Sequence, residues 1–228
     1  MKPGMPRGDV ALIANAYIGS RTDGLTLRGG ECLISYMSPS STPAITRGLR
    51  STAAEQRVRI IASAIDIFAR SGFQATPVTE IAASAAVSPA YVFRLFDGKL
   101  GLFVAAVDGC YQQVAAAMAA GVDGSPTGDP ANRLGAMTAA YVALIRDRRL
   151  ISLQVHAQSA CDVPEIRDAV RRGIALVVRA VSLESGADDA SVQRFLAYGQ
   201  LCHLVVQAGL DEVDASWART VDHGIAHL

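Results

Sequence analysis

Hydrophobic positions first repeat with a helical period near Ala53, and the repeat continues to about residue 70. Apolar side chains recur there at spacings of three and four residues, which places them on one broad face of a helix. Ser71 and Gly72 end this pattern, and Gly72 suits the left-handed position that follows many helices. The stripe consists of Ile60, Ile61, Ala64, Ile65, Ile67 and Phe68.

Two short helices are predicted next. Thr76 is the expected N-cap of the first, with Pro77 in its first turn, and Ile81, Ala82 and Ala85 form its packing face. Ser88 is the expected N-cap of the second, which starts at Pro89 and ends at the Asp97-Gly98 break. The second helix is expected to bury Val92, Phe93 and Phe96.

The turn between these short helices spans three residues, 86–88. One medium helix followed by two short ones on a tight turn is typical of the helix-turn-helix unit. In such a unit the first helices hold the third rigidly, and the third presents its first turn to the major groove of DNA.

The rest of the chain favours longer helices without strand alternation or repeats. The fold class is therefore all-α, with an N-terminal three-helix helix-turn-helix DNA-binding domain at 51–98 and a helical ligand-binding and dimerisation domain at 99–228. Residues 1–50 are rich in Gly, Ser, Pro and Thr and are predicted to be a disordered or linker extension, with Met37 as a possible native start. The expected later helices are 99–120, 131–147, 149–160, 164–184, 189–209 and 214–226.

The formal net charge is zero, but the charges are unevenly distributed. Residues 46–99 carry seven Lys or Arg and four Asp or Glu, whereas residues 100–228 carry ten and fourteen. The basic excess thus coincides with the segment that resembles a DNA-binding unit, which gives modest support to nucleic-acid binding.

Other function classes lack their usual patterns. Four cysteines stand far apart without metal-ligand spacing, which favours free thiols in a reducing cytoplasm and no metal site. No unbroken apolar run approaches the roughly eighteen residues that span a bilayer, so no membrane partner is expected. HExxH, P-loop and GxGxxG motifs are absent, as is a nucleophile signature, so neither an enzyme nor a cofactor is expected.

Three stretches, Gly72–Ala82, Ala85–Ser88 and Val92–Lys99, together resemble the tetracycline-repressor (TetR) family over roughly residues 56–104. The chain departs from that family's usual pattern at Ala86, Phe93 and Leu100, where Gly, Tyr and an acidic residue are common. The resemblance implies a dimeric and mostly repressive regulator. Its last two long helices would pair with those of a partner copy, and its middle helices would enclose a pocket for a small-molecule inducer.

Double-stranded DNA is the first expected partner. Tyr91 is the best candidate for reading a base, while Arg94 and Lys99 are expected to bind phosphates. Alternatively, Tyr91 packs on the domain surface, Lys99 is a solvated charge, and the threonines only cap their helix. The full set of DNA-binding candidates is Thr76, Thr79, Ser88, Pro89, Ala90, Tyr91, Phe93, Arg94 and Lys99.

Ligand contacts are expected where polar or aromatic residues interrupt apolar helices. Each such residue could equally be ordinary core or surface, and His156 in particular fits a structural histidine. The candidates are Tyr111, Met118, Met137, Tyr141, Gln154, His156 and Gln158.

A homodimer is expected because the helix around residues 195–206 is apolar on almost every side and so needs more than one buried face. A regulator that reads two half-sites also requires two-fold pairing. The alternative is a core helix of a monomer. The interface candidates are Phe195, Tyr198, Gly199, Cys202, Val206 and Trp217.

Two functions remain open on the sequence alone. The first is a ligand-responsive regulator, a repressor by the resemblance, that binds a palindromic operator and is released by an inducer. The second is a helical protein-interaction module that no longer binds DNA, which the departures at Ala86 and Phe93 allow.

Overall fold

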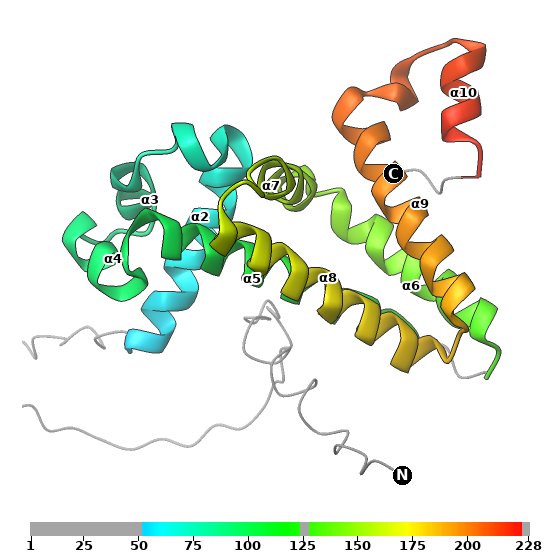
Figure 1. Cartoon of the computed structure of the whole chain (residues 1–228), viewed down its shortest axis with the longest axis horizontal. Coiled ribbons are helices and arrows are strands. Elements are labelled where there is room, and N and C mark those ends of the chain that lie inside the picture. Colours follow the sequence, from blue (N-terminus) through cyan, green and yellow to red (C-terminus); the bar gives the residue numbers. More distant parts are fainter. Residues whose placement is uncertain (1–51, 124–127, 225–228) are drawn as a thin grey trace, which may run out of the picture. The chain divides into compact units, whose positions relative to one another are not determined.

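The computed structural model describes residues 52–123 and 128–224. Within these ranges the chain forms α-helices and one short 3-10 helix, η1, without any strand, so the all-α prediction is confirmed (Figure 1). The predicted extension 1–50 lies outside the described residues. The elements are α2 (Ala53–Ala75), α3 (Val78–Ser84), α4 (Pro89–Phe96), α5 (Gly98–Asp123), α6 (Pro130–Ile145), α7 (Arg148–Ser159), α8 (Pro164–Ser185), α9 (Asp189–Ala208), η1 (Leu210–Glu212) and α10 (Ser216–Asp222).

The end of α2 corrects the predicted start of α3. Gly72 has the expected left-handed conformation, with φ 68°, and it interrupts α2 there. Thr76 does not cap α3, because its Oγ1 donates a hydrogen bond of 2.8 Å to the carbonyl oxygen of Gly72. A carbonyl at a helix end lacks its intrahelical partner, and the Thr76 hydroxyl supplies one. The N-cap position of α3 is occupied by Pro77 instead of Thr76, and α3 begins at Val78.

The turn between α3 and α4 follows the prediction closely. Ala86 has φ 54°, so an alanine occupies the left-handed position where the resembled family has Gly, at a steric cost. Ser88 caps α4, since its Oγ accepts a hydrogen bond of 3.2 Å from the Tyr91 amide. Pro89 stands in the first turn of α4, where its missing N–H costs nothing.

Of the three apolar side chains expected in the core of α4, Val92 and Phe96 are buried. The prediction for Phe93 is wrong, because its side chain is 47% exposed. Val92 and Phe96 are four residues apart and share one face, whereas Phe93 is turned about a quarter of a circle away from Val92.

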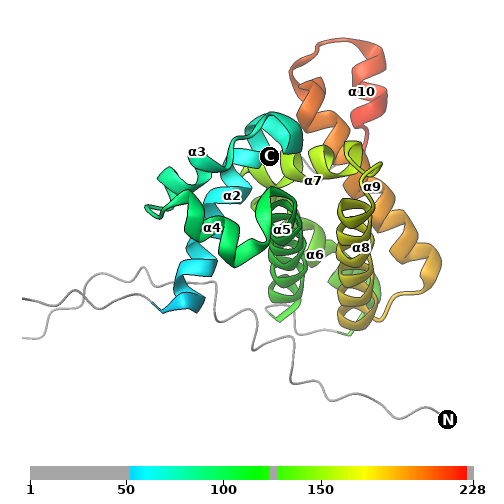
Figure 2. The same cartoon turned by 60° about the vertical axis from the view of Figure 1, so that its left-hand side comes forward.

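The long helix α5 is the centre of the packing. It contacts α4, α6, α7 and α8, and it lies beside α8 in Figures 1 and 2. Among the described helices only α5 is long and apolar enough to cross a bilayer, although Asp108 breaks its apolar run. More than half of its apolar stretch is buried inside the protein, as in a core helix.

Close contact between α5 and α8 is made possible by Gly173. This residue is buried on α8, directly against the ring of Tyr111 on α5. The later helices otherwise match the predicted spans within a few residues. The exception is 214–226, where the shorter α10 follows η1 and where residues 225–228 are not described.

Replacing Gly173 by Ala is expected to lower the free energy of unfolding by about 1–3 kcal/mol, because the added Cβ would overlap the Tyr111 ring. Gly135 provides the control, since a Cβ there meets nothing within 4 Å and Ala favours the helix by up to about 1 kcal/mol. Urea denaturation of both variants measures the two effects. Equal stability of Gly173→Ala and the parent protein would contradict the proposed close contact.

Candidate functional site

The exposed face of α4 is the first candidate site. Ser88, Pro89, Ala90, Phe93 and Arg94 are all exposed, and Tyr91 is half-buried. The Arg94 guanidinium lies 5.3 Å from the centre of the Tyr91 ring. Most of the residues predicted to contact DNA therefore gather on the start and one side of a single short helix.

Arg57 on α2 holds the other end of α4. Its Nη1 donates a hydrogen bond of 3.3 Å to the carbonyl oxygen of Leu95, and its guanidinium lies 4.5 Å from the centre of the Phe96 ring. A cation is favoured at a helix C-terminus. Arg57 is off the apolar stripe of α2, and the sequence pattern gave no sign of this positioning role.

Three candidates near α4 differ in their surroundings. Thr76 is only 1% exposed, and its hydroxyl already donates a hydrogen bond to Gly72. The prediction that Thr76 contacts DNA is therefore wrong. Thr79 on α3 is exposed. Lys99 is not a free solvated charge, because its Nζ donates to the Gln74 carbonyl oxygen at 2.9 Å and lies 5.3 Å from the centre of the Phe73 ring. Partial burial lowers the pKa of Lys99.

The second candidate site is a cavity of about 460 Å³ in the helical region. Its volume lies within the range of small-molecule pockets. Side chains from α5 to α9 form its wall. The lining residues are Tyr111, Val114, Met118, Thr138, Tyr141, Val142, Gln154, Gln158, Ile174, Val177, Phe195, Leu196, Tyr198, Gly199, Gln200, Cys202, His203 and Gly224.

Five of the seven predicted ligand contacts line this cavity: Tyr111, Met118, Tyr141, Gln154 and Gln158. Two do not. Met137 is fully buried away from the lining, and the ring of His156 lies against Gly72 of α2. A hydrophobic period of 3.6 residues shows which side of a helix is buried. It does not show whether a side chain on that side packs in the core or lines a cavity.

The face of α9 also differs from the prediction. Phe195, Tyr198, Gly199 and Cys202 line the cavity within the chain. Cys202 and Val206 are already buried within the chain, so, contrary to the prediction, they leave little surface for a partner copy to bury. Tyr198, Leu204 and Trp217 are 48%, 54% and 56% exposed, and Leu204 was not among the interface candidates.

A buried pair of polar side chains faces one another at the cavity wall. The Tyr141 hydroxyl and His203 Nε2 are 2.6 Å apart. Burial lowers the pKa of His203 to about 4 and raises the pKa of Tyr141. His203 is therefore neutral near pH 7, and Tyr141 keeps its proton to donate. His203 was missed as a site residue, and its only signal in the sequence was a histidine within an apolar helix.

Two polar atoms that belong to lining residues are buried and make no hydrogen bond of ordinary geometry among the described residues: His203 Nδ1 and the Tyr111 hydroxyl. Burial raises the pKa of Tyr111 to about 12, although the nearby Gln158 amide opposes that shift. Gln158 itself donates to Oε1 of Gln200 at 3.1 Å. No three His, Cys, Asp or Glu side chains gather as a metal site in the described part of the chain.

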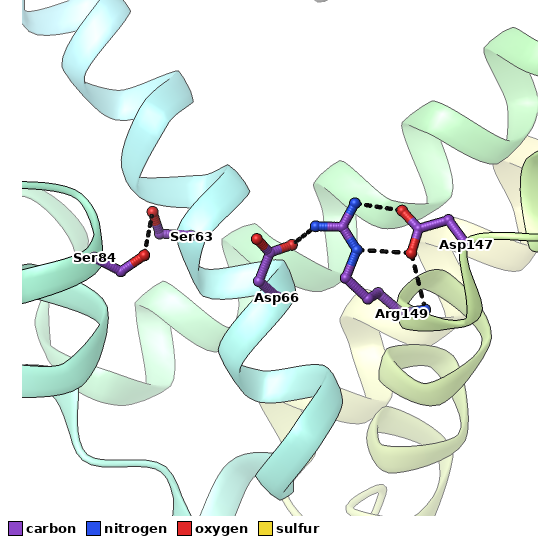
Figure 3. Close-up of polar contacts among 5 residues, drawn as sticks. All are labelled: Ser63, Asp66, Ser84, Asp147 and Arg149. Carbon is purple, nitrogen blue, oxygen red and sulfur yellow. Dashed lines mark hydrogen bonds and ion pairs between the residues drawn. The ribbon is translucent and has the colours of Figure 1, made fainter.

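Helix α7 connects the two candidate sites. Gln154 and Gln158 on α7 line the cavity, while Arg149 at its start pairs with Asp66 on α2 (Figure 3). Arg149 is held in place by Asp147, the N-cap of α7, through Nε to Oδ1 at 2.6 Å and a second, shorter contact. Ser63 and Ser84 join α2 to α3 by a hydrogen bond of 3.2 Å.

Comparison with known proteins gives a family for the first site and a fold for the chain. Residues 60–106 match the family "Bacterial regulatory proteins, tetR family". No curated protein matches the chain in sequence.

Three solved structures with the same fold are each less than 25% identical to this chain in sequence. A proposed transcriptional regulator from Pseudomonas aeruginosa PAO1 is 22% identical with a TM-score of 0.57, over 77% of this chain and 89% of its own. The regulator FadR from Bacillus subtilis, in complex with stearoyl-CoA, is 15% identical with a TM-score of 0.56, over 72% and 94%. A TetR regulator from Legionella pneumophila is 18% identical with a TM-score of 0.56, over 77% and 98%.

The depressed pKa of His203 predicts how stability depends on pH. Between the ordinary value of 6.5 and about 4, the unfolded chain binds a proton that the folded protein does not. The contribution is complete above 6.5 and falls as the pH is lowered, by about 2 kcal/mol between pH 7.5 and 5. Urea denaturation at both pH values measures this loss.

In that experiment His203→Gln is expected to reduce the loss of stability on acidification, because Gln does not titrate. His156→Gln replaces a histidine outside the cavity and is the matched control. An unchanged pH dependence in His203→Gln would show that His203 is not kept neutral by its burial.

Proposed function

We propose that the chain is a DNA-binding transcriptional regulator, because residues 60–106 match the tetR family of bacterial regulatory proteins. The observation that carries this proposal is the exposed start of α4, capped by Ser88 and backed by the buried Val92 and Phe96. A rigid helix of this kind fits the major groove of DNA. We retain the domain limits 51–98 and 99–228 as part of the proposal, since α5 begins at Gly98.

The proposed contacts divide into two kinds. Tyr91 and Phe93 offer rings to base edges or thymine methyl groups, and Arg94 offers a guanidinium to a phosphate. Phe93 has no hydroxyl to bond a phosphate, but its exposure supports an apolar contact. Lys99 has further N–H groups beyond the one bonded to Gln74, so a phosphate contact remains part of the proposal. The remaining proposed contacts are Thr79, Ser88, Pro89 and Ala90.

We propose that two copies bind a palindromic operator. Tyr198, Leu204 and Trp217 leave an apolar surface on α9 and α10 that a second copy would bury. A two-fold dimer places two α4 helices to read two half-sites. Action as a cytoplasmic repressor follows the family's most common role.

The cavity is the proposed inducer site. Its lining is mostly apolar with a few polar groups, as in many small-molecule pockets. The B. subtilis regulator with the same fold was solved in complex with stearoyl-CoA, which supports the proposal that this fold can bind a ligand.

Helix α7 is the proposed link between inducer and DNA. A ligand that moves Gln154 or Gln158 would also move Arg149, which pairs with Asp66 on α2. Any displacement of α2 would in turn reorient α4, because Arg57 on α2 holds the end of α4. Ligand binding would thereby favour an arrangement of the α4 helices that fits the operator poorly.

Arg94→Ala is expected to weaken binding to a duplex from the intergenic DNA beside the gene, and to lower the dependence of affinity on salt by about one released counterion. Fluorescence anisotropy at several salt concentrations measures both. Arg171→Ala on α8 is the control, since Arg171 is exposed but far along the chain from α4. If the parent protein shows no salt-dependent binding to this duplex or to genomic fragments, the alternative hypothesis of a protein-interaction module that no longer binds DNA is favoured.

Arg149→Ala is expected to change operator affinity by about 0.5–2 kcal/mol, as substitutions that alter coupling between sites do. Its effect on global stability should stay under about 1 kcal/mol, because the Arg149–Asp66 pair is solvent-exposed. Arg172→Ala removes a similar pair, with Asp108, between α8 and α5, and serves as the control. Operator affinity that is unchanged in Arg149→Ala would exclude this pair from the link.

A further inference from the structure

The wall of the cavity carries no formal charge. Among the described residues that line it there is no Asp, Glu, Lys or Arg. His203, the one lining residue with an ordinary pKa near neutrality, is held neutral by burial. Most of the wall is aliphatic, formed by Val114, Met118, Val142, Ile174, Val177 and Leu196.

Hydrogen-bonding groups at this wall are biased towards donors. Tyr141 keeps its proton and lies 2.6 Å from His203 Nε2, so the favoured arrangement has Tyr141 donating to that nitrogen. A neutral imidazole carries one proton, which then resides on Nδ1. Nδ1–H and the Tyr111 hydroxyl are thus two donors without an acceptor among the described residues. Buried donors of this kind are costly unless a partner arrives.

We propose that the cavity selects an uncharged, largely apolar small molecule with a carbonyl-type oxygen that accepts hydrogen bonds from His203 and Tyr111. This inference rests on the proposed function of the cavity as a ligand site. It adds the chemical class of the ligand, which neither the family nor the fold specifies.

An anion is disfavoured at this wall. An ion pair with a carboxylate would require His203 to take up a proton against its low pKa, so a carboxylate that entered the cavity would meet neutral donors and no compensating positive charge. Burial and, to a smaller extent, the negative charge of the Asp222 carboxylate raise the pKa of the lining residue Cys202, so the field of Asp222 also opposes an anion there.

A cation is the stronger rival, because aromatic rings and the field of Asp222 both attract positive charge. The two unpaired groups decide against it. The His203 Nδ1–H group is only a donor, so the positive end of its dipole opposes a cation and favours an oxygen acceptor, to which the Tyr111 hydroxyl can donate as well.

Three probes with one ring system test the proposal. The neutral ketone 6-propionyl-2-(dimethylamino)naphthalene changes its fluorescence when it leaves water, so its dissociation constant can be measured directly. The carboxylate 6-(dimethylamino)-2-naphthoate and the trimethylammonium form of the ketone are measured by displacement of the neutral probe. We expect the neutral ketone to bind the full-length protein at least tenfold more tightly than either charged analogue.

Variants assign the preference to the cavity. Tyr111→Phe removes one donor and is expected to weaken ketone binding several-fold. Gln158→Arg adds a cation to the wall and keeps a donor for Gln200, so it should shift the preference towards the carboxylate. Gln112→Arg, at an exposed position on α5, is the matched control. Circular dichroism checks that each variant is folded.

Each outcome bears on one proposal. Equal or tighter binding of the carboxylate or the cation overturns the neutral-ligand proposal while the cavity remains a ligand site. No saturable binding of any of the three probes overturns the ligand site itself, and the operator-binding measurement then tests DNA recognition separately. Ketone binding that neither Tyr111→Phe nor Gln158→Arg alters would place the ketone outside this cavity and would also overturn the proposal.

Discussion

The burial of α5 is the constraint on which the rest of the described structure depends. This helix follows α4 directly, across Asp97 and Gly98, which both have positive φ, and it continues to Asp123. Its side chains pack against α4 at its start and against α6 and α8 further along. Because one rigid helix belongs to both cores, the helix-turn-helix and the cavity wall are parts of a single packed arrangement.

Contacts of α7 complete this arrangement on the side of α2. One end of α7 pairs with Asp66 through Arg149, and His156 packs against the backbone of Gly72. These contacts differ in physical character. The ion pair is exposed and weak, whereas a Cβ at Gly72 would come within 2.9 Å of His156 Nδ1. Close packing at Gly72 therefore limits how far α7 can move, and the ion pair adds a contact that a small displacement of α7 can break.

Neutrality of the cavity follows from the same packing. Tyr141 on α6 and His203 on α9 are 62 residues apart in the chain, yet both side chains are buried where the later helices pack together. Burial removes the charged form of the histidine, and the hydroxyl of Tyr141 replaces one of its lost water contacts. A cavity made in this way distinguishes ligands mainly by charge and by the position of an oxygen acceptor.

The sequence by itself determined the elements that depend on local interactions. Helical periodicity, the Ser88 cap, Pro89 and the left-handed residue Gly72 define the helix-turn-helix, because neighbouring residues fix caps and turns. The apolar stripe also predicted the buried face of α2, but only the tertiary structure decided which side chains are buried on helices with a less clear pattern. It placed Phe93 outside, Cys202 and Val206 inside, Thr76 against Gly72, and His203 beside Tyr141. An apolar helix such as α9 has no preferred face of its own, so the helices packed around it select the residues that become buried.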